Sequence, residues 1–208
     1  MPTRYPAVSL FDRVADASDF DALYALEALT NERARDDLGQ IVRVPREQRV
    51  YGPGSGPVMA AFTHVNTLGS RFSAGEWGMF YAARERATAV AETRHHHGLF
   101  MAATKQGPMH LPMRLYHVPI DARLHDLRPV GAVPAVVHDP DDYAVSRALG
   151  ARLRAAGSAG VVYRSVRHAA GQCVGLFSPQ GAGPCLHAAY LLYAWDGARF
   201  SDVYEKTA

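Results

Sequence analysis

Glycine and proline divide this 208-residue chain into short segments, because eighteen glycines and thirteen prolines are spread along it. Glycine adopts turn conformations freely, and proline interrupts helices and central strands, so a loop-rich fold with short elements is expected. The apolar content of 48% and the net charge of only +2 indicate a folded chain rather than a disordered one. A chain of this length is expected to bury about 70% or more of its unfolded surface.

Several functional classes are disfavoured by the sequence. No run of about 18 apolar residues predicts a membrane span, and the opening residues MPTRYPAVSLFDR do not resemble a signal peptide. The 22 basic and 20 acidic residues balance, which disfavours a broad basic face for direct nucleic-acid binding but leaves a local basic pocket open. Cys173 and Cys185 form neither a metal motif nor a disulfide framework, so we expect reduced, buried thiols in a cytoplasmic protein.

Hydrophobic periodicity and turn residues predict a mixed order of helices and strands. The predicted helices cover residues 18–38, 58–65, 82–97 and 139–156, and Gly39, Gly98 and Gly157 close the first, third and fourth of them. The predicted strands cover residues 76–81, 113–118, 160–166, 173–177, 189–195 and 199–204, and IVRVP at 41–45 is also strand-like. Ser18 with Asp21 resembles a capping box. This order predicts a single α+β domain with a mixed, largely antiparallel sheet.

Two conspicuous motifs are interpreted as structural. The segment YGPGSGP at 51–57 lacks the lysine and hydroxyl residue of a phosphate loop, and its prolines remove amide donors, so we interpret it as a turn. The histidines at 95–97 point about 100° apart on a helix. Glu92 and His96 are one turn apart, but no third metal ligand is evident. We therefore expect an exposed, frayed helix end, where imidazolium suits the helix dipole, and no metal.

Arg71, Tyr81 and Glu92 are the candidate chemical residues, on a glycine-bracketed loop, a strand end and the following helix. A loop–strand–helix turn of this size can bring all three to one cleft. Arginine suits a phosphate, tyrosine suits stacking on an aromatic ring, and a carboxylate suits a cationic ribose or its hydroxyls. Taken alone these residue types are common, and surface pairing or core packing stays an alternative for each.

The stretch GSRFSAGEWGMFYAARERATAVAE, with GVVYRSVRH and CVGLFSP downstream, resembles the RES domain family. That family is named for an arginine, a glutamate and a serine, and Arg71, Glu92 and Ser165 match them, with Tyr81 at the end of the intervening strand. The resemblance runs from about Ile41 to Asp202. It divides the chain into an N-terminal helical extension at 1–40 and a RES-like, NAD-consuming domain at 41–208.

The resemblance implies a toxin of a bacterial type II toxin–antitoxin system, with a fold similar to ADP-ribosyltransferase toxins. It implies NAD+ as the substrate and cleavage of the nicotinamide–ribose bond by phosphorolysis or hydrolysis. A protein ADP-ribosyltransferase and a catalytically inactive nucleotide- or antitoxin-binding domain are the alternatives. The implied partners are an antitoxin of the Xre, ParS or MbcA type and, as acceptor, inorganic phosphate or a target protein; a metal, a membrane and direct nucleic-acid contact are not expected.

The same resemblance assigns roles to individual residues. Arg71 is expected to bind the NAD+ pyrophosphate, Tyr81 to pack against the nicotinamide or its ribose, Glu92 to hold the ribose hydroxyls, and Ser165 to orient Glu92 or the nicotinamide amide. Phe72 replaces the tryptophan usual after the arginine and keeps a ring for stacking, whereas Ser73 replaces an asparagine. The other candidates are Arg43 for binding NAD+, with Arg46 and Arg49 as competitors, and Arg164, Arg167 or His168 for a second anion site or plain surface charge.

Overall fold

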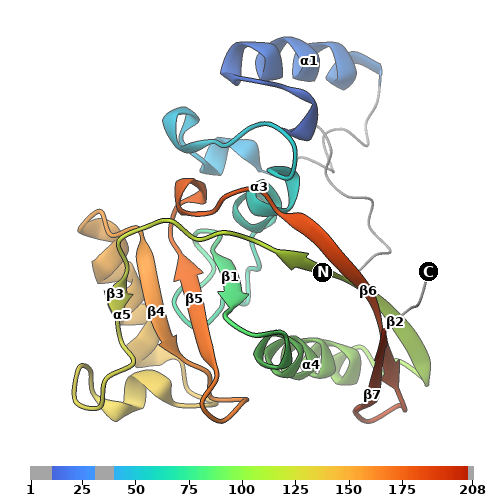
Figure 1. Ribbon diagram of the computed structural model, residues 1–208, viewed down its shortest axis with the longest axis vertical. Coiled ribbons are helices and arrows are strands. Elements are labelled where there is room, and N and C mark those ends of the chain that lie inside the picture. Colours follow the sequence, from blue (N-terminus) through green and yellow to red (C-terminus); the bar gives the residue numbers. More distant parts are fainter. Residues whose placement is uncertain (1–10, 31–39, 206–208) are drawn as a thin grey trace.

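The computed structural model describes residues 11–30 and 40–205, and of residues 24–30 it describes the backbone alone (Figure 1). The helices are α1 Ala17–Thr30, α3 Gly56–Thr63, α4 Arg86–Ala103 and α5 Ala144–Ala155. The strands are β1 Phe80–Ala83, β2 Met109–His117, β3 His125–Asp126, β4 Gly160–Arg164, β5 Gln172–Leu176, β6 Leu186–Trp195 and β7 Phe200–Glu205.

The strands form two sheets. One has the order β1-β5-β4-β3, in which only β3 joins its neighbour in parallel, and the other is the antiparallel sheet β2-β6-β7. Figure 1 shows the two sheets on either side of a central space, with α4 lying across its lower end. The predicted α+β class with a mixed, largely antiparallel sheet is confirmed.

The buried hydrophobic residues form three clusters, each in a different part of the fold. Phe72, Tyr163 and Cys173 are buried together on one face of the first sheet. Their common face follows from strand register, because Tyr163 and Ala83 both pair with Cys173 and paired residues point to the same side. The second cluster joins α4 to the second sheet, and the third joins the N-terminal part of the chain to α3; their buried members include Met101, Trp195 and Phe200 in the former and Phe11, Phe20, Val58 and Met59 in the latter.

The N-terminal helix is confirmed over its described part, and residues 31–39, with Gly39, lie outside the described residues. Its capping differs from the prediction. The Asp16 carboxylate accepts hydrogen bonds from the backbone N–H groups of Ser18 and Asp19 at 2.7 and 3.0 Å. Asp16 is therefore the cap, and Asp21 instead forms an ion pair with Arg46.

Near the start of the family-like region one strand prediction is wrong and another has the wrong start. Ile41–Arg43 forms a 3-10 turn rather than a strand, closed by a hydrogen bond from the Val44 N–H to the Ile41 carbonyl. β1 begins at Phe80 rather than at residue 76. Gly78 packs so tightly on α3 that an added Cβ would lie 2.4 Å from the Ala61 carbonyl oxygen, so this segment passes beside α3 before it joins the sheet.

Helix α4 is shifted from its predicted range of 82–97: it begins at Arg86, because Ala82 and Ala83 belong to β1, and it continues through Gly98 to Ala103. Packing overrides the weak helix propensity of glycine: Met101 is 4% exposed and lies in the cluster that joins α4 to the second sheet. The three histidines therefore lie within the helix and not at a frayed end. Because all three histidines lie inside α4, the helix geometry sets the direction in which each one leaves the helix relative to Glu92.

Replacing Gly98 by alanine is expected to raise the free energy of unfolding by up to about 1 kcal/mol, because alanine is the better helix former. A Cβ at Gly98 would lie 4.0 Å from the Trp195 and Phe200 rings, which is ordinary contact. Gly150→Ala is the matched contrast, since its Cβ would lie 2.1 Å from the Phe72 carbonyl oxygen. Urea denaturation measures both, and a lower stability for Gly98→Ala would contradict the helical packing described.

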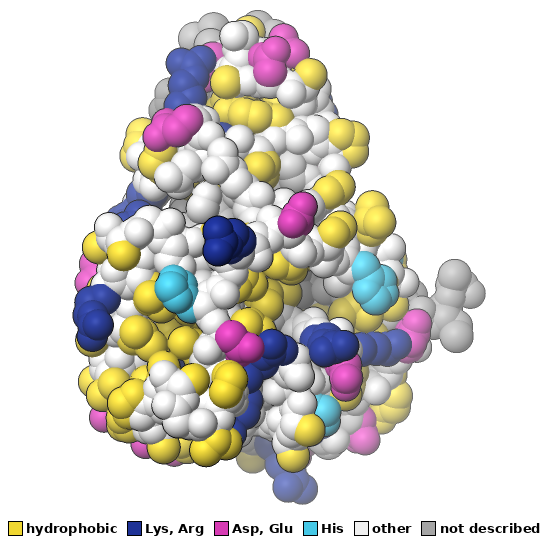
Figure 2. All heavy atoms as spheres, turned by 60° about the vertical axis from the view of Figure 1, so that its left-hand side comes forward, with side chains coloured by type: hydrophobic (Ala, Val, Ile, Leu, Met, Phe, Trp, Pro, Cys, Tyr) yellow, Lys and Arg dark blue, Asp and Glu magenta, His cyan; other side chains and the backbone are white. Residues whose placement is uncertain are grey.

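The molecular surface mixes both signs of charge. Figure 2 shows basic and acidic side chains close together around a hollow on the displayed face. Cys173 and Cys185 are free and buried, as predicted. Within the part of the chain that the structure describes, no helix has the length and apolar character needed to cross a membrane.

Candidate active site

Ser165 holds one oxygen of the Glu92 carboxylate. The Ser165 hydroxyl donates to Glu92 Oε1 at 2.6 Å and accepts from the backbone N–H groups of Arg167 and His168 at 3.1 and 3.0 Å. Ser165 lies one residue beyond β4, in the β4–β5 loop, and not within the strand as predicted. Because a charge-assisted hydrogen bond is stronger than a neutral one, this contact fixes the carboxylate while Oε2 stays open to other partners.

The β4–β5 loop is fastened to helix α4 one turn before Glu92. Thr88 is fully buried there, and its hydroxyl lies 2.9 Å from His168 Nδ1. Gly171 in the same loop approaches so closely that a Cβ would lie 2.7 Å from the Thr88 hydroxyl. Thr88 and Glu92 share a helix face, so the helix presents two polar side chains to one loop.

Arg71 lies in the loop before β1 and is only 7% exposed. Its Nη1 donates to the Asp139 carbonyl at 2.8 Å and to the Val137 carbonyl at 3.4 Å, and its guanidinium lies 4.4 Å from the centre of the Tyr143 ring. These contacts hold the guanidinium rigidly. Among the described residues Nε and Nη2 have no hydrogen-bond partner, so they can still bind an anion.

The Tyr81 hydroxyl connects the Arg71 loop to β1. It lies 2.9 Å from the Ser70 hydroxyl, accepts the Phe72 N–H at 3.1 Å and contacts the Met79 sulfur at 3.2 Å. Burial raises the pKa of Tyr81 to about 12, although the hydrogen bonds and Arg71 oppose this shift. The phenol therefore stays neutral at physiological pH and positions the loop rather than acting as a base.

Cys173 completes the surroundings of Glu92. Its sulfur lies 3.9 Å from Glu92 Oε1, and burial together with the glutamate charge raises the pKa of the thiol to about 12. A thiol with that pKa is protonated and is a poor nucleophile at neutral pH. Cys173 therefore serves as a neutral neighbour of the carboxylate.

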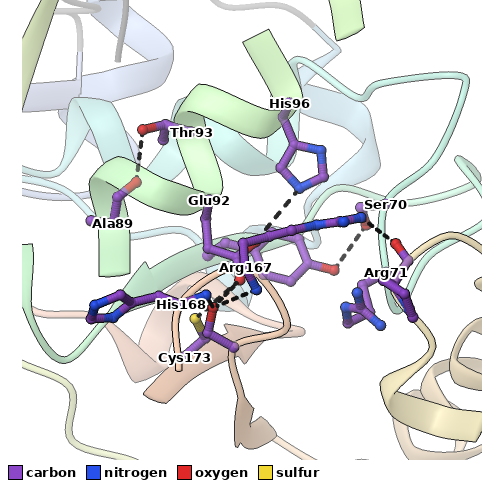
Figure 3. Close-up of polar contacts among 12 residues, drawn as sticks. Ser70, Arg71, Ala89, Glu92, Thr93, His96, Arg167, His168 and Cys173 are labelled. Carbon is purple, nitrogen blue, oxygen red and sulfur yellow. Dashed lines mark hydrogen bonds and ion pairs between the residues drawn. The ribbon is translucent and has the colours of Figure 1, made fainter. Parts of the chain in front are cut away.

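Figure 3 shows Glu92 between His96 on one side and His168 and Cys173 on the other, with Arg71 nearby. The charge of Arg71 contributes to the lowered pKa of His96 and opposes the upward shift of the Cys173 pKa, in each case less than burial does. Helix α4, the loop before β1 and the β4–β5 loop thus bring the arginine, the glutamate and the serine into one polar cluster.

A family model for the RES domain matches residues 41–196 of the chain. This protein belongs to the RES-domain family. The chain is also similar to the uncharacterized protein y4oC of Sinorhizobium fredii (strain NBRC 101917 / NGR234), with 26% identity over 212 residues that span 98% of this chain and 84% of that protein.

In this RES-domain protein two residues that the sequence predicts to bind NAD+, Phe72 and Arg43, contact other parts of the chain instead. Phe72 is fully buried and packs edge-on against Tyr163 at 5.1 Å between ring centres, so its ring is a core residue and cannot stack on a ligand. Arg43 is exposed, and it bonds the Gln40 side chain and, at 2.6 Å, the Glu76 carbonyl.

The remaining candidate arginines divide into peripheral and central ones. Arg46 pairs with Asp21, and Arg49 donates to the Val44 carbonyl at 3.0 Å, which places both in the N-terminal part of the structure. Arg167 is central: its side chain is 17% exposed, reaches the Pro140 carbonyl and lies 3.4 Å from the Asp141 carboxylate. Its Nε is buried and has no partner among the described residues.

Sequence reasoning missed two neighbours of the RES-domain cluster. Tyr143 stacks on Arg71 although it is far away in the sequence, and nothing in the pattern connects the two. His96 lies with Nε2 3.9 Å from Glu92 Oε2. The sequence shows that Glu92 and His96 are one helical turn apart. The expected helix end at Gly98, however, led to the interpretation of His96 as part of an exposed, frayed end.

A cavity of about 1150 Å³ adjoins the cluster in the space between the two sheets. Tyr81 and Cys173 belong to its lining, whereas Arg71, Glu92 and Ser165 do not. Most of the lining is apolar, and four arginines also belong to it: Arg84, Arg86, Arg114 and Arg128. The cavity is therefore a neighbour of the polar cluster and not the cluster itself.

Proposed function

We propose that this RES-domain protein cleaves the bond between nicotinamide and ribose in NAD+, as the toxin of a toxin–antitoxin pair. The observation that carries the proposal is the 2.6 Å hydrogen bond from Ser165 to Glu92 beside the buried Arg71. It joins the serine to the glutamate, and Arg71 in the same region keeps Nε and Nη2 without a partner among the described residues. Such a set suits a substrate that carries both a pyrophosphate and a cationic glycosidic nitrogen.

Glu92 is the group that acts on the reacting ribose. The bond from the ribose anomeric carbon to the nicotinamide nitrogen breaks, and the electron pair leaves with neutral nicotinamide. The anomeric carbon then carries oxocarbenium-like positive charge, which a fixed carboxylate stabilises. Ser165 holds Oε1, so Oε2 is the oxygen that contacts a ribose hydroxyl.

Arg71 and the adjoining cavity provide for the rest of the dinucleotide. Nε and Nη2 of Arg71 can donate to the pyrophosphate, while Nη1 keeps the guanidinium in place on the Asp139 carbonyl. Ligand pockets for small molecules commonly measure about 300–1,000 Å³. The cavity of about 1150 Å³ is therefore large enough for part of the substrate.

Membership of the RES-domain family supports the toxin role, and the partner is part of the same proposal. We propose an antitoxin of the Xre, ParS or MbcA type as the partner that silences the protein by covering the site. NAD+ is consumed as a substrate, and the proposed chemistry uses no metal.

The decisive experiment incubates the purified full-length chain with NAD+ labelled in its adenine ring, with and without inorganic phosphate. Loss of NAD+ and release of nicotinamide, with label in ADP-ribose or ADP-ribose-1″-phosphate, is the expected result. Added cell extract tests the transfer of ADP-ribose to a protein. Intact NAD+ under all conditions, or label found only on a protein band, would contradict the proposed function.

A further inference from the structure

His96 faces the oxygen of Glu92 that Ser165 leaves free. Nε2 of His96 lies 3.9 Å from Glu92 Oε2, whereas Ser165 binds Oε1. A separation of this size is too long for a direct hydrogen bond but allows one water or hydroxyl to contact both groups. The His96 side chain is 54% exposed, so a small acceptor can reach Nε2 from solvent.

The imidazole is surrounded by groups that keep it neutral. Burial lowers the pKa of His96 below its ordinary value; Arg167 and Arg71 lower it further, and Glu92 opposes them. Its neighbour His95 packs against it with 5.2 Å between ring centres, and the pKa of His95 is also lowered, mainly by burial and Arg167. A neutral imidazole has a free lone pair on one nitrogen and can take up a proton.

Resting on the proposed function, we propose that His96 is the general base for the acceptor, and that this acceptor is water. One water lies between Nε2 and the ribose, and its oxygen forms a bond to the anomeric carbon as the bond to nicotinamide breaks. Its proton passes to His96 Nε2 and then to solvent. NAD+ and water thus give ADP-ribose, nicotinamide and one proton.

The surroundings favour water over phosphate as the acceptor. A phosphate dianion needs cationic donors and no base. Arg167, whose charge acts on His96, directs Nη2 to the Pro140 carbonyl and the Asp141 carboxylate, and its Nε, which has no partner among the described residues, is buried. The Glu92 carboxylate, moreover, would repel a dianion at Oε2. A neutral acceptor that must lose a proton agrees with both a neutral imidazole and an adjacent carboxylate.

The test is the variant His96→Gln, with His95→Gln as the matched control on the same helix turn. In phosphate-free buffer His96→Gln is expected to lower kcat for NAD+ hydrolysis by about 10²-fold with little change in KM, because a general base typically contributes 10²–10⁴-fold. The active form is neutral, so the wild-type rate is expected to fall with decreasing pH through a pKa below the ordinary histidine value. His96→Gln is expected to lack this inflection, and His95→Gln to keep both rate and inflection.

Four other results would contradict the proposal that His96 is the general base and water the acceptor. If wild-type protein consumes NAD+ and His96→Gln keeps its kcat, the base is another group and only the His96 proposal fails. If both histidine variants lose activity equally, the effect is structural. If added phosphate makes ADP-ribose-1″-phosphate the main product and His96→Gln forms it at the wild-type rate, water is not the acceptor. If the wild-type protein leaves NAD+ intact, the proposed function itself is wrong, and the role of His96 in it is wrong as a consequence. Thermal unfolding of each variant verifies that it is folded.

Discussion

Replacing Glu92 by glutamine is expected to lower kcat for NAD+ cleavage by at least about 10²–10³-fold, the usual effect of removing an electrostatic contact to a transition state. Glutamine has nearly the same shape as glutamate, and its carbonyl oxygen can still accept the Ser165 hydroxyl. The substitution therefore removes the negative charge and leaves the local packing intact. Substrate binding through Arg71 should change little, so kcat should fall more than KM rises.

Nicotinamide release over time measures this effect, and Glu76→Gln is the control because Glu76 is an exposed glutamate in the loop before β1. Ser165→Ala is expected to lose less, because the carboxylate charge remains and only its orientation is freed. Unchanged activity in Glu92→Gln would remove Glu92 from the mechanism. An effect of Glu76→Gln as large as that of Glu92→Gln would mean that any lost carboxylate has this consequence.

Phe72→Ala is expected to give the largest loss of stability, about 3–5 kcal/mol, because it leaves a cavity in place of a fully buried ring. The ring packs on Tyr163, and the Phe72 N–H holds the Tyr81 hydroxyl. For a protein of this size each kcal/mol corresponds to roughly 2–4 °C in Tm. The loop that carries Arg71 should loosen as well.

Phe100→Ala is the matched control, because Phe100 is 51% exposed on α4. Its free energy of unfolding should change by less than about 1 kcal/mol, as for most surface substitutions. Urea denaturation at fixed protein concentration compares the two variants. A stability of Phe72→Ala close to that of the wild type would show that Phe72 is not the core residue described.

Local patterns predicted the parts of the fold and site that depend on neighbours in sequence. The hairpin at Asp196-Gly197 is confirmed, because its turn residues fix the pairing of the strands that flank them. The order of Arg71, Tyr81 and Glu92 along a loop, a strand and a helix was likewise readable, although the strand begins four residues later than predicted.

Features set by distant packing could not be predicted from such patterns. Glycine commonly follows the end of a helix, yet α4 continues through Gly98 because the second sheet buries part of its last turns. The stacking of Tyr143 on Arg71 and the packing of Phe72 against Tyr163 each join segments far apart in the chain. The family resemblance pointed to Ser165, but only the structure places it in the loop beyond β4 with its hydroxyl on Glu92.

The contact between the N-terminal residues and α3 has a consequence for how this protein can be shortened. Phe11 and Phe20 stack at 4.8 Å between ring centres, and both are buried in one cluster with Val58 and Met59. A shortened chain that begins at residue 41, where the family match begins, would lack both rings. The apolar side chains of α3 that they cover would then be exposed to solvent. The boundary of the family is therefore not a boundary of cooperative unfolding: the two parts should melt together in a single transition.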